Sequence, residues 1–145
     1  MTVPADAAAS AIDDLCRARV AWIRDGRVGL TLDGTSYEIH LAIAGDASRL
    51  PKAGKRTSGV IHGKALRMHR AGAGGRFIEP VLGHPRIVQG TVMATDPAAN
   101  RMLADVVVPM WLQLEPDQPV REFATGDLVN FYCASGMTFT PADRA

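Results

Sequence analysis

The chain has 145 residues, of which 47% are hydrophobic and 21% charged, a composition typical of a globular protein and unlike that of disordered chains. Its formal net charge of +1 hides an uneven distribution, because residues 1–48, 49–86 and 87–145 carry −3, +8 and −4. No stretch approaches the ~20 apolar residues of a membrane-spanning helix, and the first residues lack the basic start of a signal peptide. We therefore expect one soluble, cytoplasmic domain over residues 1–145 with no membrane partner.

The first predicted element is a short helix over residues 5–18. This segment is rich in alanine, and Ile12, Leu15 and Cys16 recur at the three- and four-residue spacing of a narrow apolar stripe on a helix. Everything after it has the character of β-structure.

Residues 19–44 predict a three-strand meander. Apolar residues alternate with polar ones here, and the runs are separated by the pairs Asp25-Gly26 and Asp33-Gly34. Such pairs tolerate the positive φ of tight hairpin turns, so they are a strong hairpin signal. In the third strand His40 shares a face with Glu38 opposite the apolar residues, so we expect the His40 side chain to point to solvent.

Residues 45–59 are polar and predict a long connecting loop. Residues 60–70 predict a strand whose alternation is imperfect, and a bulge or bend near Gly63 would reconcile its two halves.

The segment 60–140 contains the remaining predicted strands. Its clearest hairpin joins residues 86–95 to residues 101–108 through a turn beginning with Asp96-Pro97. In all, about eight or nine short strands with frequent turns predict an all-β, mainly antiparallel fold, either a small barrel or a sandwich. The glycines at Gly59 and Gly90 resemble those that relieve curvature in small barrels such as the OB-fold.

The basic segment supplies the candidate binding residues. Five of its cations lie where side chains reach solvent. Lys64, Arg67 and Arg70 are on the predicted strand 60–70, Arg76 directly follows the glycine-rich turn, and Arg86 begins the predicted strand 86–95. If they share one face, they form a surface for phosphate groups of nucleic acid or another polyanion. Aromatic residues are nearly absent from this segment, which weakens a base-stacking mechanism.

Motifs for chemistry are absent from the sequence. His62 and His69 have no further ligands at metal spacing, and Cys133 ends an apolar strand without the surroundings of a catalytic nucleophile. Two cysteines, Cys16 and Cys133, give no disulfide framework, so we expect reduced thiols. We predict no catalytic residue, no metal and no cofactor.

Three functions remain open. The first is a binding module whose basic surface contacts a polyanion such as nucleic acid. The second is a structural or oligomeric assembly protein in which the basic segment pairs with the acidic flanks, within the chain or between copies. The third, an enzyme, has the least support, because no group of residues meets the geometric requirements for an acid, base or nucleophile.

Overall fold

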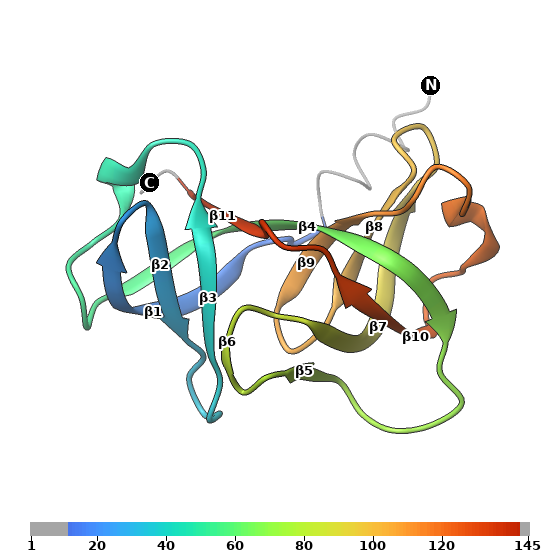
Figure 1. Cartoon of the computed structure of the whole chain (residues 1–145), viewed down its shortest axis with the longest axis horizontal. Coiled ribbons are helices and arrows are strands. Elements are labelled where there is room, and N and C mark those ends of the chain that lie inside the picture. Colours follow the sequence, from blue (N-terminus) through green and yellow to red (C-terminus); the bar gives the residue numbers. More distant parts are fainter. Residues whose placement is uncertain (1–11, 143–145) are drawn as a thin grey trace.

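A computed structural model describes residues 12–142. These residues form an all-β protein with one mixed sheet of eleven strands (Figure 1). The strands are β1 (Cys16–Arg24), β2 (Arg27–Thr31), β3 (Glu38–Ile43), β4 (Arg56–Arg70), β5 (Phe77–Glu79), β6 (Leu82–Gly83), β7 (Ile87–Asp96), β8 (Arg101–Asp105), β9 (Pro109–Gln113), β10 (Leu128–Cys133) and β11 (Thr138–Pro141). Two short 3₁₀ helices lie at Ala47–Arg49 and Val120–Glu122.

The predicted three-strand meander is confirmed. β1 pairs with β2, and β2 with β3, both antiparallel. The first turn uses the Asp25-Gly26 pair as expected, since φ is 52° at Asp25 and 73° at Gly26. Tight hairpin turns require positive φ values, and asparagine, aspartate and glycine adopt such values most readily. The hairpin of β7 and β8 is confirmed as well.

The predicted N-terminal helix over residues 5–18 is wrong where the structure describes it. Residues 16–18 begin β1, and Cys16 lies opposite Gly59 of β4. Cys16, Ala18 and Val20 are buried in alternation, so the period-2 pattern of a strand prevails over the short helical spacing. Residues 5–11 lie outside the described residues. The structure shows no α-helix between residues 12 and 142.

β4 is the common strand of two closed cycles of pairing (Figure 1). One cycle runs through β1, β2, β3, β11 and back to β4. The other runs through β10, β7, β8, β9 and back to β4. Most pairings are antiparallel, as expected, but β3–β11, β3–β6 and β4–β9 are parallel. The segment 56–59, expected in a loop, belongs to β4 because it pairs with β1.

The irregularity expected in the strand near Gly63 occurs three residues later. Phe131 of β10 lies opposite Met68, but Cys133 lies opposite Ala65, so Leu66 and Arg67 together face one residue of β10. Ala65 and Met68 are both buried. The extra residue therefore lets both halves of β4 present their apolar side chains to the core.

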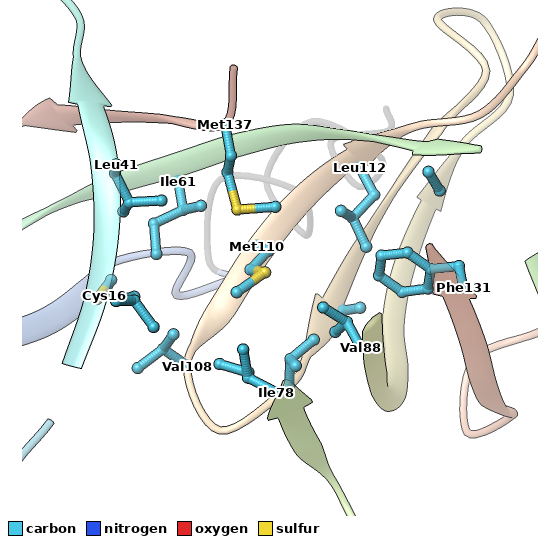
Figure 2. Packing of buried hydrophobic residues seen from close by; sticks show 14 of the residues in the cluster. Cys16, Leu41, Ile61, Ile78, Val88, Val108, Met110, Leu112, Phe131 and Met137 are labelled. Atoms are coloured by element: carbon cyan, nitrogen blue, oxygen red, sulfur yellow. The ribbon is translucent and has the colours of Figure 1, made fainter. Parts of the chain in front are cut away.

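A single cluster of buried residues spans both cycles. Figure 2 shows Met110 and Met137 between Leu41 and Ile61 on one side and Phe131 on the other.

The glycines Gly59 and Gly90 lie where strands come very close. A Cβ atom on Gly90 would lie 2.6 Å from the Asp105 carbonyl oxygen, and one on Gly59 would lie 2.4 Å from that of Thr140.

Candidate functional site

The structure separates the five predicted anion-binding residues into two groups. Lys64 and Arg86 flank the end of β10, because the Ala134 N–H donates to the Lys64 carbonyl (3.0 Å) and the Cys133 N–H to the Arg86 carbonyl (2.8 Å). Two strand spacings of ~4.8 Å thus separate their backbones. Arg67 lies farther along β4, next to the same strand.

Arg70 and Arg76 are engaged elsewhere. The Arg70 Nε donates to Asp127 (3.2 Å) and its guanidinium lies 5.3 Å from the centre of the Phe123 ring. Arg76 forms an ion pair with Asp105 of β8. Both guanidinium groups therefore tie strand ends to neighbouring segments.

Acids of the flanks neutralise much of the basic segment. Its ion pairs with these acids are Arg49–Asp46, Arg56–Asp33, Arg67–Asp117, Arg70–Asp127 and Arg76–Asp105. The Arg67–Asp117 pair is long, 3.8 Å, and more than half of each side chain is exposed, so it contributes little and is easily exchanged. Lys52, Lys55, Lys64 and Arg86 form no ion pair with any residue between 12 and 142.

An exposed aromatic side chain lies on β10, the strand between the backbones of Lys64 and Arg86. Tyr132 of β10 is 59% exposed and stands where Leu66 and Arg67 face β10 from β4. Leu66 is itself 43% exposed, and on the other side Tyr132 lies opposite Ile87, the neighbour of Arg86 in the chain. We call Lys64, Leu66, Arg67, Arg86 and Tyr132 the basic-aromatic face. It combines positive charge with a ring and an aliphatic side chain open to solvent.

An open pocket of about 360 Å³ adjoins this face. It lies between β4, β11 and the turn that joins β10 to β11, and its lining residues are His62, Gly63, Lys64, Ser135, Gly136 and Thr138. No carboxylate is among them. Partial desolvation, and after it the positive charge of Arg101, lowers the pKa of His62 from 6.5, so the imidazole is mainly neutral at pH 7.

A second polar cluster lies on β1 and β3, and it corrects the expectation for His40. The His40 side chain is only 19% exposed, and its Nε2 donates to Glu38 (2.7 Å). The Trp22 indole N–H donates to the same carboxylate (3.1 Å) and its ring packs edge-on against His40 at 4.9 Å. Hydrogen bonds from His40, and then from Trp22, lower the pKa of Glu38.

The remaining arginines and histidine of this region are also engaged. Arg24 lies 4.4 Å above the Trp22 ring, and Arg27 donates to Nδ1 of His84 at 2.6 Å. His84 therefore accepts a hydrogen bond from another part of the chain. Each of these side chains contacts another within the chain, which is the behaviour of a structural network.

Both cysteines are free in the structure. Burial raises the pKa of the Cys16 and Cys133 thiols to about 12. Since the thiolate is the reactive form, neither side chain is a strong nucleophile at neutral pH.

Sequence reasoning missed Tyr132, the aromatic member of the face. Tyr132 lies within a largely apolar run, residues 128–133, which does not by itself indicate an exposed ring. Alternation was the available signal: Val129 and Phe131 are buried, whereas Tyr132 shares its side of the strand with the polar Asn130.

Between residues 12 and 142, no three His, Cys, Asp or Glu side chains gather in a metal-binding arrangement. Nor does that part of the chain contain a helix long and apolar enough to cross a membrane. Comparison with protein families, curated proteins and solved structures finds no match to this chain.

Proposed function

We propose that the protein binds single-stranded nucleic acid on the basic-aromatic face. The observation that carries this proposal is the exposed ring of Tyr132 on β10, the strand whose end pairs with Lys64, a cation without an acidic partner in the described chain. Arg86, a second such cation, lies at the same end of β10. Proteins that bind single strands combine a positive surface that follows the backbone with aromatic rings on which bases stack. The face offers both, with Leu66 as a further apolar contact.

The proposal specifies a single strand rather than a duplex for a geometric reason. The ring of Tyr132 lies on the surface of a sheet, where only unpaired bases can reach it. In a duplex the bases are paired and stacked on one another, so their faces are not open to this ring. Lys64, Arg67 and Arg86 then contact phosphates, whereas Arg70 and Arg76 contribute less because they are already paired.

The test is a fluorescence-anisotropy titration of a short single-stranded oligonucleotide and of its duplex at about 50 mM and 200 mM salt. With about three phosphate contacts, affinity for the single strand should fall about 20-fold between these concentrations. The double variant Lys64→Glu/Arg86→Glu should bind about 100-fold more weakly at the lower salt.

A matched control separates this face from general charge. Lys52→Glu/Lys55→Glu changes the net charge of the same basic segment by the same amount, at two exposed residues of the loop before β4. It should alter affinity less than about threefold. Equal losses in both double variants, binding insensitive to salt, or no binding at the lower salt would contradict the proposal.

A second candidate function follows from the ion pairs between the basic segment and the acidic flanks. They support the hypothesis of a structural protein whose basic segment is neutralised within the chain. Its assembly form requires copies to associate through the unpaired cations. Light scattering across a range of protein concentrations and salt tests it, and a monomer throughout would rule the assembly form out.

We also propose, as the finer description of the fold, that each cycle of strand pairing is a small closed barrel resembling the OB-fold. Closure is supported by the β3–β11 and β4–β9 pairings, and closed sheets leave no open edge for aggregation. Amide nuclear Overhauser effects across these two pairings test it. The cytoplasmic location stays a prediction.

A further inference from the structure

We infer that the pocket beside Lys64 holds a terminal phosphate monoester of the bound strand, so that the protein prefers phosphorylated strand ends. This inference rests on the proposed function, because Lys64 belongs both to the pocket and to the basic-aromatic face.

The chemistry of the lining matches a dianion. Lys64 provides an ammonium group with no carboxylate near it, Ser135 and Thr138 bring hydroxyl groups, and His62 brings an imidazole. All four side chains can donate hydrogen bonds. A phosphate monoester carries close to two negative charges at pH 7 and three terminal oxygens that accept them, whereas an internal phosphodiester carries one charge and two such oxygens. The donor set therefore favours the monoester.

The backbone around the pocket is shaped to leave room. Gly136 adopts φ +93°, in the region that favours glycine, and nothing lies within 4 Å of the place where a Cβ would stand. Gly63 forms another part of the lining, but the space of its missing Cβ is occupied by Met137, which packs within 2.6 Å of that position. The pocket of about 360 Å³ is larger than a phosphate group and falls within the range of small-ligand sites.

The pocket lies close enough to Tyr132 for one strand to use both. Ser135 follows Tyr132 by three positions in the chain, a separation that spans at most ~11 Å. A strand whose end enters the pocket is therefore within reach of the Tyr132 ring and of Arg67, which faces β10 beside it. This geometry links end recognition to the stacking surface.

The experiment compares one oligonucleotide sequence with a 5′-hydroxyl, a 5′-phosphate or a 3′-phosphate, each carrying its fluorophore at the opposite end. We expect one phosphorylated form to bind about 10-fold more tightly than the hydroxyl form. Ser135→Ala/Thr138→Val should remove this preference and leave affinity for the hydroxyl form unchanged. The matched control Ser36→Ala/Thr125→Val alters two exposed hydroxyl residues away from the pocket and should keep the preference.

The outcomes distinguish the two proposals. If no form of the strand binds at low salt, the proposed function fails. If the hydroxyl form binds and neither phosphorylated form binds more tightly than it does, the proposed function stands and this inference is overturned. A preference that survives in Ser135→Ala/Thr138→Val also overturns it, because the phosphate would then be held outside the pocket.

Discussion

The outer surfaces of the two pairing cycles contain similar residue types but use them differently. On β1, β2 and β3, the polar and aromatic groups satisfy one another: Trp22 and His40 donate to Glu38, and Arg27 donates to His84. On β4 and β10, Tyr132 is exposed, and Lys64 has no acidic partner in the described chain. The difference teaches that clustering of charged and aromatic residues alone does not mark a binding surface. Our proposal therefore rests on an unpaired cation that lies close to an exposed ring.

The largest expected effect comes from disrupting the contact between Trp22 and Glu38. Gly29 lies beneath Trp22, and a Cβ there would lie 2.4 Å from the indole ring. Gly29→Ala forces the indole from its place and separates it from Glu38, so we expect a loss of about 3 kcal/mol in the free energy of unfolding. Urea denaturation measures it.

A second variant isolates the cause in Gly29→Ala. In a Trp22→Leu background the clash is relieved, and Gly29→Ala should be almost neutral, since alanine is otherwise better suited than glycine to a strand. An equal loss in both backgrounds would show that the indole is not responsible. Affinity for the single strand should stay unchanged in folded Gly29→Ala protein.

The next largest effect comes from removing the exposed ring on β10. Tyr132→Ala removes the exposed ring and should lower affinity for single strands about 30-fold, or about 2 kcal/mol, through the loss of base stacking. Tyr132→Phe keeps a stacking surface and should bind within about twofold of the unaltered protein. Anisotropy titration measures both. Equal losses would mean that the hydroxyl group, and not stacking, is what matters.

The smallest expected effect is the pH dependence of stability that Glu38 contributes. The pKa of Glu38 lies below its usual 4.5 in the folded protein, so its carboxylate stabilises the fold above pH 4.5, and this contribution is lost as the pH falls through the lowered pKa. Glu38→Gln should therefore cost about 1 kcal/mol at pH 7, and this cost should shrink as the pH falls through the lowered pKa. Urea denaturation at a series of pH values from 7 downward, with the exposed Glu79→Gln as the control, measures it. A pH-independent loss would contradict this assignment.

The elements that the sequence predicted well are those with local signals. Asp25-Gly26 specified its own turn, and the β7–β8 hairpin followed from alternation on both sides of Asp96-Pro97. The parallel pairing of β3 with β11 carries no such signal, because it joins residues about a hundred positions apart in the chain. Residues 16–18 were assigned to a helix because of the spacing of Ile12, Leu15 and Cys16, and their actual partner, residues 57–59, fell in a segment predicted to be a loop.

The candidate site was predictable only in part. Charge clustering identified Lys64, Arg67 and Arg86, but the same reasoning included Arg70 and Arg76, whose acidic partners are distant in sequence and near in space. Tyr132 comes next to these cations only through the pairing of β10 with β4 and β7. Such neighbours depend on tertiary structure, which a linear pattern does not reveal.

The position of β4 in both cycles has a consequence for how the chain folds during synthesis. Its partners include β1, near the start of the chain, and β10 and β11, near residue 140. Neither cycle can close before the last of these strands has left the ribosome. Contacts between such distant segments also slow folding, because the intervening chain must lose its freedom first. We therefore expect the apolar strands of nascent chains to stay exposed until β10 and β11 emerge.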